Sequence, residues 1–437
     1  MAQGALAVSP HVASSYMKYF RWQQLNGINW QNATTDYGSS FPFGWVAPRW
    51  DPRTFEIGTI NDQNPMSILA YYYHIMNTGD RRFLEHSMPV MDAIATMIRQ
   101  TCNTSQLVTD PDPAVGRFNF SADSDELALG ALMVSMARTS TGLGNHSGGE
   151  NWWDVVGFGG WDSWTNVWVV AAWDALADTK RWSGDAAGAE QYEALFARAK
   201  LAFNKKFWDD ERGGYADWVD VRGNSHFHFF TATQSMAILT GIANATQRDI
   251  ILRTFKSSYA HLHTQFNLTD DDLFCTPSNF IPLLPSEMGG RKDSEDPSNH
   301  GHYSEFPGYE NGVCFFFNTA LEIAMWGFAG EPDIAFDKYN RFMQQGFDRD
   351  GARLWGQHYS WGVGSKTGFG SSDVLTNVML NLWGFTRGSF GVWPRLNEGL
   401  VVRGRPAKMM EGASHRFAFL GKDAEVRVKD GKTSVHE

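Results

Sequence analysis

The sequence predicts an all-α domain that carries a small C-terminal β appendix. Apolar residues recur at three- and four-residue steps in one segment after another, and short polar breaks separate these segments. Only the tail from about Ser389 alternates like strands. With 43% apolar and 19% charged residues, the 437-residue chain can bury a large core, which excludes global disorder.

The chain divides into three parts by pattern. Residues 1–55 are aromatic and loop-like, because Phe41–Trp45 (FPFGW) and Ala47–Pro52 (APRWDP) would break any long helix. We expect this segment to pack on a helical unit over residues 56–388. Residues 389–437 then form a short β-rich extension.

The first two helices have recognisable ends. Asn64 can cap a helix and Pro65 suits its first position, where the missing N–H costs nothing, and Gly79 ends the run. Another helix begins near Arg82 and carries apolar residues to Ile98.

The clearest helix follows Gly184-Asp185 and ends near Phe207, before a Gly-Gly turn. Its single apolar stripe is formed by Tyr192, Leu195, Phe196, Ala199, Phe203 and Phe207. Further helices are expected over Ser163–Ala177, Thr231–Ile242, Gln247–Tyr259, Phe315–Trp326, Ala335–Gln345 and Ser372–Trp383, and strands around VRGRP, HRFAFL and Glu425–Asp430.

Helical pairs joined by short loops form a bundle, an open solenoid or a closed α-toroid. No repeat of fixed length appears, which disfavours a solenoid of the TPR or HEAT type. The unusual residues gather in loops such as Gly149–Asp162 and Gly301–Gly312. A toroid whose loops converge at one end would bring them into one pocket, so this arrangement fits best.

Composition limits the partners. The net charge of −11 and the lack of a basic block exclude binding to phosphate backbones through bulk electrostatics, so we expect no nucleic acid. No long uncharged apolar run is present, so we expect no membrane span. The aromatic content of 14% suits a core, and it also suits platforms for sugar rings. The oligomeric state stays open.

Cysteines and targeting signals add little. Cys102, Cys275 and Cys314 form no CxxC pair, so neither a disulfide scaffold nor a zinc knuckle is expected. The first residues lack the features of a signal peptide. Six glycosylation sequons agree with a secretory protein or with chance in a Ser-, Thr- and Asn-rich chain: Asn32, Asn103, Asn119, Asn145, Asn244 and Asn267.

Asp154 is the first candidate for acid chemistry. It follows two tryptophans in ENWWD, and a carboxyl group against indole rings loses solvation of its charged form, which raises its pKa. A protonated acid near neutral pH is what leaving-group protonation at a glycosidic oxygen requires. An aspartate capping a helix beside core aromatics would have the same sequence. Glu150, four residues earlier, could bind a sugar hydroxyl or simply be solvated.

Hydrolysis also needs a carboxylate that activates water. Glu305 and Glu310 lie in the loop SEFPGYENG, and Asp373 stands at a helix start. Solvation explains the glutamates equally well, and pairing with a helix N-terminus explains Asp373. Asp62 is a candidate ligand, although a local helix cap is the simpler interpretation.

Other chemistries lack their motifs. HExxH, the Walker lysine loop and GxSxG are absent from the sequence, so no metal and no organic cofactor is expected. His226 and His228 could chelate a metal ion, yet no companion ligand is evident and packing is the simpler interpretation.

Five stretches occur in the order found in one enzyme superfamily. Gly142–Gly157 (GLGNHSGGENWWDVVG) matches a GLPLxGxGDWNDGMN pattern, and Ala189–Asp209 matches AERYRxxAxxLxxAxNxxxWD. Thr231–Gly241 is similar to AQSWAVLSG, Tyr309–Ala320 to RENGGQYTHAA, and INDQNP around Asp62 to SDDLLW. The chain therefore resembles the six-hairpin, (α/α)6-barrel glycosidases over about residues 55–425. The resemblance is strongest to the catalytic module of the cellobiose/chitobiose phosphorylases.

This resemblance implies roles for single residues. Asp154 falls on the general acid of the family, and Asp62 falls near an aspartate that binds sugar. The spacing Glu150…Asp154 is also similar to the ESGxD stretch of trehalase- and processing-glucosidase-like hydrolases.

The chain departs from the phosphorylases at their phosphate site. Phe317 stands where they have a histidine, and Gly368–Asp373 (GFGSSD) replaces a Thr-Gly segment. A buried phenyl ring donates no hydrogen bond to phosphate, so water is the expected nucleophile. The resemblance then implies hydrolysis with inversion.

The base is less defined. Trehalase-like relatives place a glutamate where Trp355–Trp361 has Gln357, so Glu310 becomes our first choice, Asp373 the second and Glu305 the third. Sugar-stacking platforms are expected among four tryptophans, of which about half should only pack: Trp45, Trp152, Trp153 and Trp161.

The expected function is thus an inverting glycoside hydrolase that acts on a glucoside or oligosaccharide. Asp154 would be the acid, Glu310 or Asp373 the base, and Asp62 and Glu150 ligands of sugar hydroxyls. Three alternatives stay open: a phosphorylase or transglycosylase on the same fold, a sugar epimerase that uses His226 and His228, and a sugar-binding protein without activity.

Overall fold

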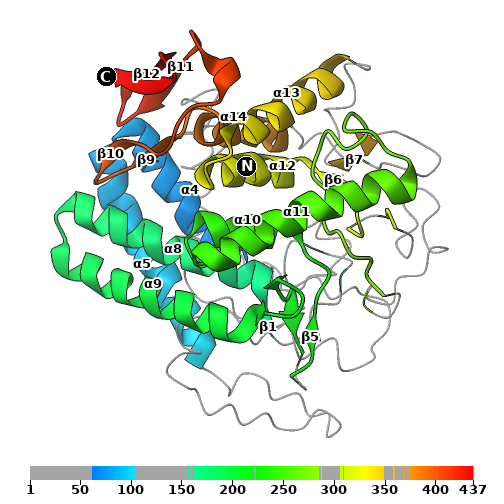
Figure 1. The fold of residues 1–437 in the computed structure, drawn as a ribbon. Coiled ribbons are helices and arrows are strands. Elements are labelled where there is room, and N and C mark those ends of the chain that lie inside the picture. Colours follow the sequence, from blue (N-terminus) through cyan, green and yellow to red (C-terminus); the bar gives the residue numbers. More distant parts are fainter. Residues whose placement is uncertain are drawn as a thin grey trace, which may run out of the picture.

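A computed structural model describes residues 62–103, 153, 156, 161–220, 223–284, 287, 306–308, 310–348, 358–359, 368–369 and 375–436. Helices dominate these residues (Figure 1). They are α4 (Gln63–Thr78), α5 (Arg81–Asn103), α8 (Ser163–Ser183), α9 (Ala186–Phe207), α10 (Thr231–Leu239), α11 (Ala245–Phe266), α12 (Phe316–Phe328), α13 (Pro332–Asp348) and α14 (Leu375–Gly388). Among them, no helix is long and apolar enough to cross a membrane.

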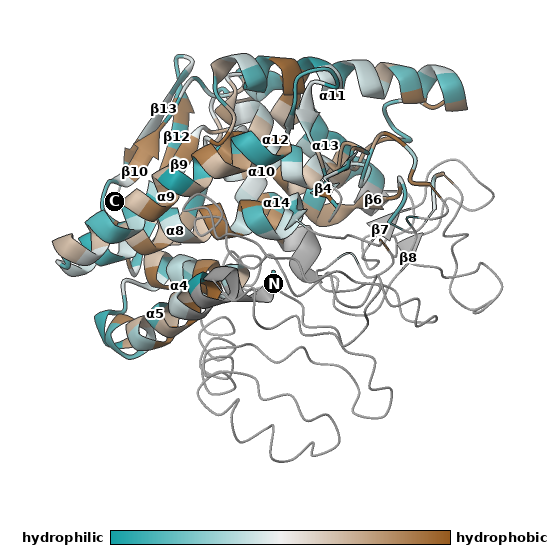
Figure 2. Cartoon of the chain, turned by 90° about the horizontal axis from the view of Figure 1, so that it is seen from below, coloured by the Kyte–Doolittle hydropathy of each residue, from teal (hydrophilic) through white to brown (hydrophobic). Residues whose placement is uncertain are grey.

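The helices form an inner and an outer layer. In α12 every residue from Phe316 to Gly327 is buried, and α8 and α10 are buried on most of their surface. By contrast, α9 buries one stripe that includes Tyr192, Leu195 and Phe203, as its periodicity predicts. Figure 2 shows the matching mixture of hydrophilic and hydrophobic residues along α9 and α11. In the part of the chain that the structure describes, inner helices (α4, α8, α10, α12, α14) thus alternate with outer helices (α5, α9, α11, α13).

The inner helices contact one another in chain order. α4 packs on α8, α8 on α10, α10 on α12 and α12 on α14. The first and last of them also meet, because the ring of Tyr73 lies edge-on to Trp383 at 6.4 Å between centroids. Each inner helix except α14 is followed by its outer partner, as Figure 1 shows for α8–α9 and α12–α13. A complete (α/α)6 barrel has twelve helices, so the six-hairpin ring stays a prediction.

Glycine allows the closest approach within this layer. A Cβ atom on Gly384 would lie 2.5 Å from the backbone oxygen of Ala320, and one on Gly388 would lie 2.3 Å from that of Ile323. The backbones of α12 and α14 therefore approach closely where α14 carries glycine and so has no side chain.

Several helix ends differ from the sequence prediction, among them the start of α4 and the end of α10. α4 begins at Gln63 with Asp62 as its N-cap residue, so Asn64 is not the cap and Pro65 lies in the first turn. α10 stops at Leu239 rather than at residue 242, because Gly241 takes a positive φ of 65° and ends the helix there.

Short strands occupy the loops, and longer ones form the tail. The loop strands are β1 (Trp161–Asp162), β2 (Trp208–Asp209), β3 (Gly214–Tyr215), β4 (Trp218–Val219), β5 (Ser225–His226), β6 (Cys314–Phe315), β7 (His358–Tyr359) and β8 (Gly368–Phe369). The tail has β9 (Val392–Arg395), β10 (Gly399–Val402), the 3-10 turn η5 (Lys408–Met410), β11 (Ser414–Phe419), β12 (Lys422–Lys429) and β13 (Lys432–His436). The prediction of a strand at VRGRP is wrong beyond its first residue: Val402 ends β10, and Gly404 then takes a φ of 77°.

The tail is tied to the inner helices. Leu420 donates its backbone N–H to the Met76 carbonyl at the end of α4 over 2.7 Å. Leu396 donates to the carboxylate of Asp178 in α8 over 2.8 Å. Figure 1 shows β11 and β12 beside α4, next to the C-terminus. The β appendix therefore packs against the side on which α4 and α8 end.

Candidate functional site

Trp153 marks the point where the inner helices begin. Its side chain has no exposed surface. Its ring centroid lies 5.6 Å from that of Trp164, 4.8 Å from Phe230 and 5.4 Å from Phe315. Trp164 lies in the first turn of α8, and Phe230 and Phe315 are the N-cap residues of α10 and α12. Three helix N-termini therefore converge on one buried indole.

The N-terminus of α4 joins the same cluster through Asp62. This side chain is 1% exposed, and one carboxylate oxygen accepts the indole N–H of Trp164 over 2.6 Å. The carboxylate makes no capping bond to the backbone of α4. Asp62 therefore occupies the N-cap position of α4, but its side chain does not cap the helix. A buried carboxylate needs hydrogen-bond donors, and here a distant helix supplies one.

A small sheet brings three separate loops together beside this cluster. β6, β7 and β8 pair so that Phe315 lies opposite His358, and His358 lies opposite Phe369. These strands belong to the stretches YENGVCFFF, WGQHYSW and GFGSSD, which the sequence analysis singled out separately. Gln357 and Asp373 within them lie outside the described residues.

Glu310 lies in a tight turn that leads into β6. Gly308 and Asn311 exchange backbone hydrogen bonds of 2.8 and 2.9 Å across the turn. Glu310 between them has a φ of 55°, a left-handed conformation that a residue with a side chain rarely adopts. Its side chain is fully buried rather than exposed at a pocket rim, which corrects the expectation for this loop. A strained backbone and a buried carboxylate coincide here.

Neighbouring segments hold this turn in place. The side-chain oxygen of Asn311 accepts the backbone N–H of Leu283 over 2.9 Å. The backbone N–H of Gly312 donates to the side-chain oxygen of Asn279 over 2.7 Å. The segment around residues 279–283 therefore fixes the position of Glu310.

Asp217 is a buried acid that the sequence analysis did not consider. It accepts backbone N–H groups of His228 and of Phe230, the latter over 2.9 Å. Burial raises the pKa of Asp217 to about 6, although the charge of His228 and these hydrogen bonds oppose the shift. The sequence YADWVD around it gives no signal for this role. Because both bonds position the start of α10, we interpret Asp217 as a structural residue of the site.

His226 and His228, the two histidines considered as metal ligands, both contact the carboxylate of Glu287. Nδ1 of His226 lies 2.7 Å from one oxygen of Glu287, and Nε2 of His228 lies 3.1 Å from the other. Both rings stack on the indole of Trp218, at 4.4 and 5.5 Å between centroids. The described residues contain no group of three or more side chains arranged to hold a metal ion. The packing interpretation therefore agrees with these contacts.

The tryptophans expected to stack on sugar are covered where the structure describes them. Trp153 has no exposed surface, so the expectation that a sugar ring stacks on it is wrong. Trp161 is 6% exposed, and the ammonium group of Lys206 lies 3.4 Å from its ring centroid. Both rings pack. The other predicted site residues lie outside the described residues: Trp45, Glu150, Trp152, Asp154, Glu305, Gln357 and Asp373.

Phe317 occupies the position at which the resemblance predicted a lost phosphate ligand. It is 8% exposed and packs against Trp164 at 5.8 Å and Phe315 at 5.9 Å between ring centroids. This side chain offers no hydrogen-bond donor to an anion.

No protein-family model matches the sequence, and no curated protein matches it. Solved structures do match. A family GH78 rhamnosidase of Bacillus sp. GL1 has a TM-score of 0.51 at 14% identity, covering 86% of this chain and 32% of that one. A structure described as a sialidase has a TM-score of 0.54 at 11% identity, covering 86% and 31%. An α-L-rhamnosidase from Dictyoglumus thermophilum has a TM-score of 0.50 at 13% identity, covering 95% and 39%.

These likenesses concern the fold. At such low identity they confirm the predicted resemblance to glycoside hydrolases with helical-barrel catalytic domains at the level of chain architecture. The chain spans about a third of the length of these three structures.

Proposed function

We propose that this chain is an inverting glycoside hydrolase whose site lies where the inner helices begin. The observation that carries the proposal is the convergence of α8, α10 and α12 on Trp153, which α4 joins through the bond from Trp164 to Asp62. The carboxylates of Asp62 and Glu310 are buried in the residues that precede α4 and α12. Loops at one end of a helical ring provide a pocket with several convergent polar groups. The likeness in fold to rhamnosidase structures supports the reaction class.

Asp154 is the proposed general acid. It follows Trp153 directly in the chain, and Trp153 lies among four aromatic rings. An aromatic environment disfavours the charged carboxylate and keeps the proton available at neutral pH. The acid then protonates the glycosidic oxygen as the bond to the leaving group breaks.

Glu310 is the proposed base, with Asp373 as the alternative. Support for Glu310 comes from its strained backbone and its buried side chain, a combination that is frequent at functional sites. Support for Asp373 comes from its place four residues after Phe369, whose strand pairs with β7. In an inverting enzyme the two carboxyl groups stand about 6.5–9.5 Å apart, because a water molecule must fit between the base and the sugar.

Asp62 and Glu150 are the proposed ligands of sugar hydroxyl groups. The bond from Trp164 orients the carboxylate of Asp62, which accepts hydrogen bonds. The substrate is a glucoside or an oligosaccharide, in keeping with the resemblance of Asp62 to a sugar-binding aspartate.

The alternatives have less support. A phosphorylase needs an anion site, and Phe317 places a phenyl ring there. An epimerase needs two histidines that are free to exchange protons with the substrate, and both candidates contact Glu287. A sugar-binding protein without activity differs from a hydrolase in an activity assay, because it binds the sugar and releases no product.

The test is a screen of α- and β-linked disaccharides and glucans in phosphate-free buffer, with NMR detection of the product anomer. We expect hydrolysis with inversion. Asp154→Asn and Glu310→Gln should each lower kcat/KM by about 100-fold or more. Asp249→Asn, on the exposed face of α11, serves as the control and should keep full activity. Near-native activity of Asp154→Asn would remove the acid assignment, and product release only in added phosphate would favour the phosphorylase.

A further inference from the structure

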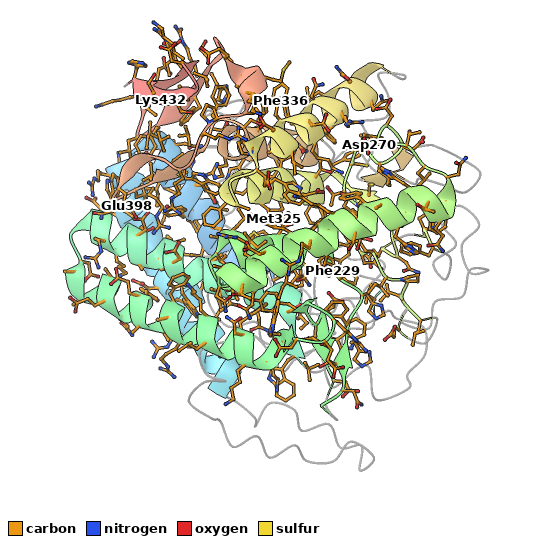
Figure 3. The ribbon with its side chains drawn as sticks, in the orientation of Figure 1. Phe229, Asp270, Met325, Phe336, Glu398 and Lys432 are labelled. Atoms are coloured by element: carbon orange, nitrogen blue, oxygen red, sulfur yellow. The ribbon has the colours of Figure 1, made fainter. Side chains whose placement is uncertain are left out.

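A cavity lies toward the opposite end of the inner helices, where they stop. Its volume is about 130 Å³. Its walls include Tyr73 of α4, Trp168 of α8, Leu239 of α10, Phe328 of α12, Trp383 of α14 and Trp393 of β9. Leu239 and Phe328 are the last residues of their helices. In Figure 3, Met325 in the last turn of α12 lies within the helical layer, and Glu398 marks the β9–β10 turn on the side where α8 ends.

Packed indoles separate this cavity from the proposed catalytic site. Trp164 contacts Trp153 on one side and Trp168 on the other, where the ring centroids are 5.4 Å apart. Both rings are at most 9% exposed. The cavity is lined by Trp168 but by neither Trp153 nor Trp164, so these two indoles lie between it and the proposed catalytic site.

Arg387 brings a buried positive charge to this cavity. The side chain lines it and is only 6% exposed. The guanidinium carbon lies 4.3 Å from the ring centroid of Trp383, 5.7 Å from Tyr73 and 5.8 Å from Trp393. Its hydrogen bond to the Trp383 carbonyl is long, at 3.5 Å. Within the described ranges no carboxylate acts on it, and burial lowers the pKa of Arg387.

A buried charge without a partner of opposite sign is unfavourable. Cation–π contacts and the C-terminal end of α14 offset part of this cost. The side chain of Tyr73 and the Trp383 carbonyl accept hydrogen bonds from the guanidinium group. This group has five donors, so two acceptors do not satisfy it.

Three indoles of the same cavity add further donors. The Nε1 atoms of Trp168, Trp383 and Trp393 are buried and have no hydrogen-bond partner in the part of the chain that the structure describes. Buried indole N–H groups ordinarily find an acceptor. The carboxylate of Asp174, which also lines the cavity, is occupied by Arg395 in an ion pair. The cavity is thus rich in donors and poor in free acceptors.

We propose that this cavity binds a small organic carboxylate. The carboxylate would take two parallel N–H bonds from Arg387, and its apolar body would lie among the aromatic walls. The volume of about 130 Å³ is of the same order as the cavity of about 150 Å³ that accommodates benzene. Arg403, which is exposed and lies over the ring of Phe328 at 5.7 Å, lines the cavity and attracts the anion. This inference does not depend on the proposed hydrolase activity.

The test is isothermal titration calorimetry of the full chain with benzoate, which carries a carboxylate on a benzene ring. We expect saturable binding of one benzoate per chain. Benzamide, which has the same shape without the charge, and inorganic phosphate, which has the charge without the ring, should each bind at least about tenfold more weakly.

Variants locate the site. Arg387→Met should weaken benzoate binding by at least about tenfold, whereas Arg253→Met, on the exposed face of α11, should leave it unchanged. If Arg387→Met does not fold, Arg403→Met at the cavity provides the second test and should weaken binding about threefold. The proposal is overturned by absent benzoate binding, by equal binding of benzamide or phosphate, or by unchanged affinity in the arginine variants.

Discussion

The indole N–H of Trp164 donates to the carboxylate of Asp62 over 2.6 Å and so joins the first turn of α8 to the N-cap of α4, 102 residues away. Both side chains are at most 2% exposed. This bond fixes the orientation of the carboxylate that we propose as a sugar ligand. It also links the two inner helices at the end where the proposed site lies.

Removing this donor should destabilise the protein. Trp164→Phe leaves a buried carboxylate with one hydrogen bond fewer, and bonds to charged groups contribute about 1.5–3 kcal/mol. Trp168→Phe is the matched control, because its indole N–H has no partner within the described residues. We expect Trp164→Phe to lower the free energy of unfolding by about 2 kcal/mol more than Trp168→Phe in urea titrations. Equal losses would show that the bond adds no stability.

The cluster of Glu287 with His226 and His228 should make stability depend on pH. Burial acts to raise the pKa of Glu287, but hydrogen bonds from His228 and His226 outweigh it and bring the pKa to about 2. This carboxylate therefore stabilises the folded state at pH values above its pKa in the unfolded chain, which is about 4.5. The stabilisation is lost as the pH falls toward 2.

The pKa of His228 sets the upper end of the pH range in which this cluster stabilises the protein. Burial acts to lower its pKa, while the bond to Glu287 and the charges of Asp217 and Glu287 raise it above its ordinary value. Its contribution is complete below about pH 6.5 and is lost as the pH rises through the folded-state pKa. His226 also faces Asp220, at 3.5 Å.

Glu287→Gln should therefore lower the free energy of unfolding most at intermediate pH. We expect a loss of about 2 kcal/mol near pH 5.5 and a smaller loss above neutral pH, measured by urea unfolding across a pH series. Glu331→Gln, which removes an exposed ion pair with Lys256, should change stability by less than about 1 kcal/mol at every pH. A loss for Glu287→Gln that does not vary between pH 5 and pH 9 contradicts the assignment.

Asp178 should anchor the β tail to the helices. It is 4% exposed and accepts the hydroxyl of Tyr72 over 2.7 Å and the backbone N–H of Leu396 over 2.8 Å. Asp178→Asn replaces an acceptor oxygen by a donor and should cost about 3 kcal/mol, read as a lower Tm. Asp174→Asn is the control: its side chain is 36% exposed, so its ion pair with Arg395 contributes less. A larger loss for Asp174→Asn would show that the ion pair, and not the buried acceptor, holds the tail.

The contact between α12 and α14 should not tolerate a side chain at Gly384. A methyl group there would lie 2.5 Å from the Ala320 carbonyl oxygen, and a backbone atom cannot move aside without shifting the helix. Gly384→Ala should cost about 2 kcal/mol or more in thermal unfolding. Gly188→Ala, in the first turn of α9, meets only the exposed side chain of Asp185 and should stay within about 1 kcal/mol of the parent chain. Similar Tm values for the two variants would mean that the helices can separate at no cost.

Local sequence determined most of the helices. α9 runs from Ala186 to Phe207, as its capping aspartate and single apolar stripe predict. α11 begins two residues before the predicted Gln247, because Asn244 and Gln247 form a capping box. Helix period and caps depend on residues a few positions apart, so they can be read without the tertiary structure.

Tertiary packing decided the site. The burial of Trp153 among rings from three helices, the bond between Trp164 and Asp62, and the left-handed turn at Glu310 depend on residues far apart in the chain. A tryptophan in a core and a tryptophan on a sugar platform have the same local sequence, and only the packing of neighbouring helices sets its exposure. The sequence by itself therefore gave the helices, their order and the candidate carboxylates. The three-dimensional fold determined which side chains meet, because hydrogen bonds and aromatic contacts form between whichever surfaces the helices bring together.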